Sequence, residues 1–158
     1  MNVFVLDEDK QLAAQYHCDK HVVKMVTETA QLLSSAYYYT GEKYWAPYKL
    51  SHANHPWALW TRETEMNWVW LCEFGIALYN EYKYRYYNRT HSAGEVILQM
   101  KSVTPSLPQG DLTRMPLCMP DSCKRDTTVA SYRAYYNEYK THLFSWTGRE
   151  TPFWVKIT

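Results

Sequence analysis

The thirty residues from Asp9 to Tyr38 contain neither glycine nor proline, and this uninterrupted stretch strongly limits what the chain can fold into. Within it, residues recur at steps of three, four and seven, which is the spacing of one face of an α-helix. The stripe consists of Leu12, Asp19, Val23, Val26, Ala30, Leu33 and Tyr37. We therefore expect one core-facing helix here, ending at Gly41.

The rest of the chain predicts a mainly α protein. A second helix should begin at Pro56, capped by Asn54 or His55, and run to about residue 88 as two helices or as one helix kinked near Gly75. Further helices are expected over about 92–103, opened by the capping-box pattern at Ser92, and from a cap at Asp126 or Thr127 to about 146. The sequence thus predicts a single compact domain over residues 1–158 with four to six helices. Val3–Leu6 forms a short strand or a buried arm, and a long proline-containing loop spans 105–126.

Composition excludes several classes of protein. Of the 158 residues, 46% are hydrophobic and 21% charged, which excludes wholesale disorder. The formal net charge of +1 gives no reason to expect tight non-specific DNA binding, although a local basic groove is compatible with it. No apolar run is long enough for a membrane span, and residues 1–9 do not form a signal peptide. With four cysteines and no C-x-x-C spacing, we expect reduced thiols, no membrane partner and a cytoplasmic location.

The chain is rich in aromatic residues, with 15 Tyr, 7 Trp and 4 Phe. Tryptophans at helical spacing, namely Trp57, Trp60 and Trp68, should fill the core. The tyrosine runs over 37–39, 82–87 and 132–139 exceed what one core stripe can hold, so some of these rings should be exposed. Beside lysine and arginine they suit either bases and phosphates or a protein interface.

A second face of the first predicted helix carries candidate chemistry. Its members, spaced by three and four residues, are His17, His21, Lys24, Glu28, Gln31 and Ser35. This face is either solvated or the wall of a site with imidazole, amine and carboxylate groups in mutual reach, as acid–base catalysis requires.

Asp19 lies on the opposite, apolar stripe. An ionised carboxylate that faces a core needs a partner or a shifted pKa. Asp19 is therefore a structural ion-pair partner, a helix cap if the helix breaks near Cys18, or a catalytic group. The expected partners are a tyrosine hydroxyl or one of three arginines, Arg62, Arg85 and Arg133.

The polar cluster before Pro56 offers a second candidate site. Asn54 and His55 at a helix N-terminus either bind an anion or only cap the helix. Together with His17, His21 and His52, His55 also raises the hypothesis of a zinc site. The sequence has no H-E-x-x-H motif and no grouped cysteines, so the leading prediction assigns no metal and no cofactor.

Several blocks of the sequence resemble a family of small bacteriophage proteins. These blocks are Val5-Leu6-Asp7-Glu8-Asp9, Ala13-Ala14, Cys18-Asp19-Lys20-His21-Val22-Val23-Lys24-Met25, Glu28, Ala30-Gln31-Leu32, His52, Asn54-His55-Pro56, Trp60, Asn67, Trp70-Leu71, Glu81-Tyr82, Arg85-Tyr86, His91, Met119-Pro120, Tyr132-Arg133 and Tyr135-Tyr136. Members are sometimes labelled pyrimidine-dimer DNA glycosylases, by distant similarity to the helical endonuclease V family of repair enzymes.

The resemblance implies a mechanism. In the endonuclease V family an N-terminal α-amine attacks the sugar carbon of the damaged nucleotide, an imine forms, and a nearby glutamate handles protons. This sequence begins Met1-Asn2, and methionine is poorly removed before asparagine, so no small N-terminal nucleophile is expected. The amine role would then pass to Lys20 or Lys24, or else Asp19 or Glu28 would steer water in a non-covalent reaction.

The leading prediction is therefore a nucleic-acid- or nucleotide-directed enzyme, a DNA N-glycosylase with or without lyase activity, acting in the host cytoplasm if phage-encoded. The expected catalytic residues are Asp19, His21, Lys24 and Glu28. The expected substrate-binding residues are Lys20, Asn54, His55, Arg62, Asn67, Arg85, Tyr132 and Arg133. The alternatives are a phage protein that sequesters a nucleotide or inhibits a host protein, and a metal-dependent hydrolase with histidine ligands.

Overall fold

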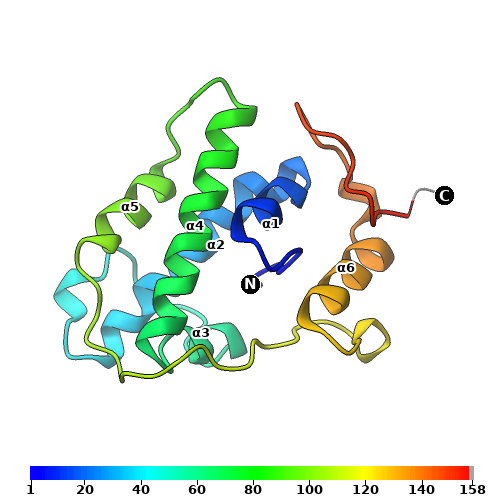
Figure 1. Cartoon of the computed structure of the whole chain (residues 1–158). Coiled ribbons are helices and arrows are strands. Elements are labelled where there is room, and N and C mark those ends of the chain that lie inside the picture. The colour runs from blue at the N-terminus through cyan, green and yellow to red at the C-terminus, as the bar shows by residue number, and fades with distance from the viewer. Residues whose placement is uncertain (157–158) are drawn as a thin grey trace.

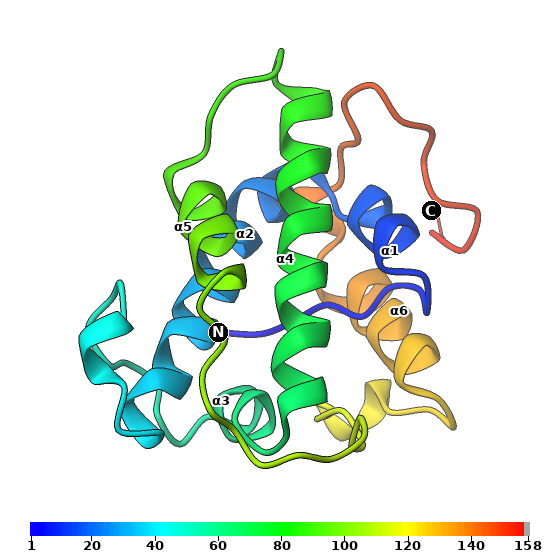
Figure 2. The ribbon, with the colours of Figure 1, turned by 60° about the vertical axis from the view of Figure 1, so that its left-hand side comes forward.

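A long central helix, α4 (Glu65–Arg85), organises the molecule, and most of the other helices pack against it, whereas the last one lies apart from it (Figure 1). The computed structural model describes residues 1–156, and this part of the chain is helical with no β-strand. The remaining α-helices are α1 (Lys10–Tyr16), α2 (Asp19–Ala36), α3 (Pro56–Thr61), α5 (Ser92–Lys101) and α6 (Thr128–Tyr139). Figure 2 shows α5 on one side of α4, with α1 and α6 on the other. The predicted helical class is confirmed.

The expected continuous helix over 9–38 is wrong at one point, because the chain leaves the helical conformation at His17 and Cys18 (ψ 134° and 159°). Distant groups bind the backbone amides at this break. The Tyr136 hydroxyl lies 3.4 Å from the Cys18 nitrogen, and the Asp19 nitrogen donates to the Ser145 carbonyl at 2.8 Å. Of the predicted core stripe, Leu12 and Val23 are 39% and 40% exposed, whereas Val26, Ala30 and Leu33 are fully buried.

The apolar segment Val3–Leu6 is a buried arm and not a strand. Phe4 stacks on the ring of His21 with centroids 4.5 Å apart and contacts Tyr136 edge to face. The guanidinium of Arg133 donates to the Leu6 carbonyl at 2.8 Å. These contacts hold the start of the chain between α2 and α6.

The tryptophan-rich region forms two helices that separate at residues 62–64, not at Gly75. His55 caps α3 as predicted, since its side chain accepts from the Trp57 amide at 3.1 Å. A Cβ on Gly75 would lie 2.9 Å from side-chain atoms of Ile97 and Thr29, so the glycine permits close packing of α4 against α2 and α5. Trp57, Trp60 and Trp68 are buried, which confirms their core role.

The remaining elements follow the sequence with small corrections. His91, not Ser92, caps α5 by accepting from the Ala93 amide. The loop over 105–126 is held to the body by Asn67, whose side chain donates to the Thr113 hydroxyl and accepts from its amide at 2.8 and 3.0 Å. Thr127 caps α6, which ends at Tyr139 instead of near 146. Short 3₁₀ turns cover Tyr37–Tyr39, Lys43–Trp45, Asp121–Cys123 and Thr141–Leu143.

Within residues 1–156, none of the helices is both long enough and apolar enough to cross a bilayer.

Candidate functional site

The N-terminal arm brings the backbone nitrogen atoms of residues 1 and 2 to Glu28 on α2. The amino group of Met1 lies 3.9 Å from Glu28 Oε1, and the Asn2 amide donates to Oε2 at 3.2 Å. Lys24, one helical turn earlier, places Nζ 3.6 Å from Oε1. The side chain of Glu28 is only 12% exposed, whereas that of Lys24 is 66% exposed. A largely buried carboxylate therefore faces two amino groups.

The side chain of Asn2 fixes the position of the N-terminal backbone, including the Met1 amino group. Its Oδ1 accepts from the Val3 amide at 2.9 Å and from Trp57 Nε1 at 3.0 Å, and its Nδ2 donates to the Cys118 carbonyl at 2.9 Å. The hydroxyl of buried Tyr132 lies 3.3 Å from the same Oδ1 and donates to the Pro116 carbonyl at 2.7 Å. Asn2 is thus tied to α3, to the long loop and to α6.

His55 completes the cluster from the N-terminal end of α3. Its pKa is lowered by burial and by the positive charge of the amino terminus, against the opposing effect of Glu28. Because Nδ1 accepts the Trp57 amide proton, the neutral ring carries its hydrogen on Nε2. We call Met1, Asn2, Lys24, Glu28 and His55 the Glu28 site.

The Glu28 site combines the groups that nucleophilic and acid–base catalysis need. An amino group can attack an electrophilic carbon, a carboxylate can accept a proton, and an imidazole can donate or accept one. Lys24, Glu28 and His55, all expected from the sequence, come together here. Sequence reasoning missed Met1 and Asn2, and the apolar segment Val3–Leu6 that directly follows them was the available signal.

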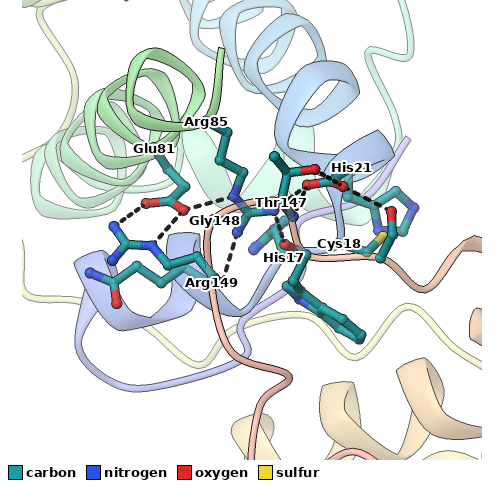
Figure 3. Close-up of polar contacts among 12 residues, drawn as sticks. His17, Cys18, His21, Glu81, Arg85, Thr147, Gly148 and Arg149 are labelled. Carbon is teal, nitrogen blue, oxygen red and sulfur yellow. Dashed lines mark hydrogen bonds and ion pairs between the residues drawn. The ribbon is translucent and has the colours of Figure 1, made fainter. Parts of the chain in front are cut away.

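Asp19 and Arg85 belong to a different cluster, around the C-terminal end of α4. Figure 3 shows Arg85 of this cluster beside Glu81 and Arg149. Arg85 is buried and donates to Asp19 Oδ1 at 3.0 Å, to Glu81 Oε2 at 2.8 Å and to the His17 and Gln15 carbonyls at 2.8 Å each. Arg149 makes two further bonds to Glu81, at 2.9 and 3.0 Å. We call Asp19, Glu81, Arg85 and Arg149 the charge network.

The expectation that Asp19 has a cationic or hydroxyl partner is confirmed. Besides Arg85, its carboxylate accepts from the hydroxyls of Ser145 and Thr147 at 2.8 Å each and from the Thr147 amide at 2.9 Å. Partial burial opposes ionisation, but these hydrogen bonds prevail and lower the pKa of Asp19. Glu28 follows Asp19 by nine positions on α2, which is about 14 Å along the helix axis.

His17 and His21 do not share an open face with Lys24 and Glu28. His17 lies at the break, before α2 begins, and the ring of His21 is covered by Phe4 of the arm and by Tyr136 of α6. His17 is fully buried, and His21 is 4% exposed. The pKa of His17 is lowered to about 4 by burial and by Arg85, partly offset by its bond to the Ala13 carbonyl. Burial and nearby positive charge lower the pKa of His21 to about 3, and its Nδ1 lies 2.6 Å from the Tyr136 hydroxyl.

Because these two histidines have lowered pKa values, we expect the unfolding free energy of the protein to fall in mild acid. Above pH 6.5 both are neutral in the folded and unfolded states, whereas below it the unfolded chain binds protons that the folded chain excludes. Between pH 6.5 and 5 each histidine should therefore remove up to about 1.4 kcal/mol of unfolding free energy per pH unit. Urea titrations at several pH values from 7.5 to 5.0 give the unfolding free energy at each pH. Its decrease with falling pH should be smaller in His17→Gln and in His21→Gln than in the parent. Exposed His52→Gln is the control, and an unchanged pH dependence in both core variants would contradict the prediction.

The other predicted binding residues are dispersed. Lys20 and Asn54 are exposed. Arg62 donates to the Ala53 carbonyl and lies over the ring of Tyr39. Arg133 pairs with Asp7 at 2.9 Å. Asn67 and Tyr132 are buried and hold backbone groups, as described above.

The proposed histidine metal site is not assembled. His17 and His21 lie in the core, whereas His52 is exposed on the loop before α3. Throughout residues 1–156, no three His, Cys, Asp or Glu side chains are grouped so that they could hold a metal ion. The cysteines in this range are free thiols, and burial raises the pKa of Cys72 to about 11.

Comparisons with protein-family models, with curated proteins and with solved structures found no match to this chain.

Proposed function

We propose that the protein is a nucleic-acid-directed enzyme, a DNA N-glycosylase that removes a modified or damaged base at the Glu28 site. One observation carries the proposal: a carboxylate that is 12% exposed lies 3.9 Å from the Met1 amino group and 3.6 Å from Lys24 Nζ. An amine and a glutamate are also the pair that the resemblance to the endonuclease V family implies.

The proposed reaction follows from these groups. The amine attacks C1′ of the target nucleotide, and the bond from C1′ to the base breaks with its electrons leaving on the base. Glu28 accepts the proton released by the amine. The sugar ring then opens to give an imine between C1′ and the protein nitrogen, and the ring oxygen takes the electron pair and a proton. Glu28 returns this proton to the ring oxygen, the departing base takes a proton from solvent, and neutral His55 can donate a hydrogen bond from Nε2 to either group.

Two amines can serve as the nucleophile. Where Met1 is the first residue of the chain, its nitrogen is a primary amine held in place through Asn2. The other amine is Lys24 Nζ, which is mostly exposed. The sequence favoured a lysine, but we favour Met1, because a nucleophile that is already positioned loses less entropy on reaching the reactive geometry.

Borohydride trapping tests the proposal. Sodium borohydride reduces a protein–DNA imine to a stable secondary amine, which joins protein and DNA covalently. The probes are a duplex with one cyclobutane pyrimidine dimer and a duplex with one abasic site. We expect a cross-linked band with at least one probe, and peptide mapping should place the link on Met1. A link on Lys24 would keep the function and change the nucleophile. Binding of both duplexes without cross-link or strand cleavage would overturn the proposal.

A further inference from the structure

Cationic side chains from α2 and from the end of α6 meet over the N-terminal arm. Lys140, which follows α6 directly, places Nζ 5.0 Å from the ring centroid of Tyr135 and 5.9 Å from that of Phe4. Phe4 in turn stacks on His21 of α2, with 4.5 Å between the two ring centroids. Tyr139, whose ring lies 5.6 Å from that of Tyr135, is 46% exposed. Lys140 therefore lies beside the first turn of α2, although the two segments are far apart in the sequence.

The pKa of His21 reflects this positive charge. Burial is the main cause of its lowering to about 3, and the positive charges that add to it belong to His17 and to Lys140, Lys24 and His142. The last three lie nearer the surface than the ring that they affect, since the side chain of Lys24 is 66% exposed and His142 is exposed. Positive charge thus reaches the same ring from α2 and from the end of α6.

The lysines of α2 lead from this point to the Glu28 site. The helix is continuous from Asp19 to Ala36. Within it, Lys20, Lys24 and Glu28 follow one another at steps of four residues, so they share one face. Glu28 lies seven positions beyond His21, or about 10 Å along the axis. We call Lys20, Lys24, Tyr139, Lys140 and His142 the lysine surface.

The lysine surface keeps a net positive charge when the neighbouring acidic residues are counted. Three of these residues are paired with arginines, namely Asp19 with Arg85, Glu138 with Arg125 and Asp7 with Arg133. Glu28 offsets one of the three lysines, so two positive charges remain even without the Met1 amino group. Glu8 and Glu150 lie near α1, because Glu8 directly precedes the cap of that helix and Glu150 lines a cavity with Gln15. A polyanion is therefore the partner that matches this surface.

We infer that the lysine surface binds the phosphates of a nucleic acid strand next to the target nucleotide. Lys20 and Lys140 each neutralise a phosphate, and the Tyr139 hydroxyl donates to a further phosphate oxygen. Phosphates recur at a regular spacing along a strand, so cations on two separate segments can bind them without contacting the bases, and we expect little sequence preference. The inference rests on the proposed function for the position of the target nucleotide, but its test measures binding alone.

The experiment measures the fluorescence anisotropy of a labelled DNA duplex that carries one tetrahydrofuran residue in place of an abasic site. This residue has no hydroxyl group on C1′ and forms no imine, so binding is separated from chemistry. In the full-length protein, Lys20→Gln and Lys140→Gln should each lower the slope of log affinity against log salt concentration by about one. At low salt, the double variant should bind at least about five-fold more weakly than the parent.

The variant Tyr139→Phe gives a second readout. It removes a hydroxyl group but no charge, so the affinity should fall by about two- to ten-fold, the range for one hydrogen bond, while the salt slope stays as in the parent. Thermal unfolding of each variant verifies that the fold is retained.

Matched controls are Lys83→Gln and Lys101→Gln, which remove lysines that lie on or against α4 instead. Their salt slopes should equal that of the parent. The inference is overturned if Lys20→Gln and Lys140→Gln keep the parental slope and affinity, as they would on a surface that serves an acidic protein, or if the controls lose as much. Salt-dependent binding through the lysine surface without any borohydride adduct would instead reject only the proposed function.

Discussion

Replacing Glu28 by glutamine should slow formation of the borohydride-trapped adduct by about 10²- to 10⁴-fold, the usual contribution of a positioned general acid or base. Glutamine keeps the size of the side chain and can still accept from the Asn2 amide, which glutamate does at 3.2 Å in the native protein. What it lacks is the capacity to accept the proton that the attacking amine releases. The rate should therefore fall while the affinity for the abasic duplex stays within a few-fold of the parent.

Single-turnover kinetics with the abasic duplex would measure this loss. The matched control is Glu73→Gln, which changes an exposed glutamate of α4 that pairs with Lys10 at 2.7 Å. Its rate should equal that of the parent. Asp19→Asn is the informative comparison, because Asp19 lies in the charge network and should retain the rate at a temperature where the variant is folded. A Glu28→Gln rate within three-fold of the parent would remove Glu28 from the chemistry.

Replacing Arg85 by methionine should cost about 3–5 kcal/mol of unfolding free energy, the range for breaking a buried ion pair. The side chain of Arg85 is 0% exposed and joins Glu81, Asp19 and two carbonyls that close α1. Methionine fills similar volume but donates no hydrogen bond, so the two carbonyls lose the donor that Arg85 supplies, and Asp19 and Glu81 each lose one of several donors, in a place that water barely reaches. In a domain of this size the melting temperature should drop by roughly 6–20 °C.

Urea and thermal unfolding at pH 7.5 would test this expectation. Arg125→Met is the control, because Arg125 pairs with Glu138 at 3.3 Å with both side chains more than 40% exposed. An exposed pair of this kind contributes less than about 1 kcal/mol, so the control should unfold nearly as the parent does. Similar stability for the two variants would show that the charge network is dispensable.

Helix caps made by residues close in sequence could be predicted, whereas a helix break that depends on distant residues could not. His55 before Pro56 and Thr127 before α6 act as caps through hydrogen bonds that span two or three residues, and such signals are present in the sequence itself. The break at Cys18 has no such signal. It depends on Tyr136, which is 118 residues away, and no glycine or proline marks it.

The candidate site divides in the same way. Lys24 and Glu28 are four residues apart on one helix, so their proximity follows from the spacing. The approach of Met1 to Glu28 depends on where the buried arm packs, and that is decided by contacts of Phe4 with His21 and of Asn2 with Trp57. Asp19 was recognisable as a carboxylate in need of a partner, and Arg85 was among three candidates, but only the tertiary structure selects it.

The charge network also bears on how fast this helical protein folds. Helical domains usually fold quickly because most of their contacts are local in sequence. Here, Thr147 bonds to Asp19 across 128 residues, and Arg149 bonds to Glu81 across 68. Such hydrogen bonds form only after a long loop has closed, and closing the loop costs chain entropy before the bonds can offset it. We therefore expect these long-range bonds to form late in folding, so that weakening them should accelerate unfolding more than it slows folding.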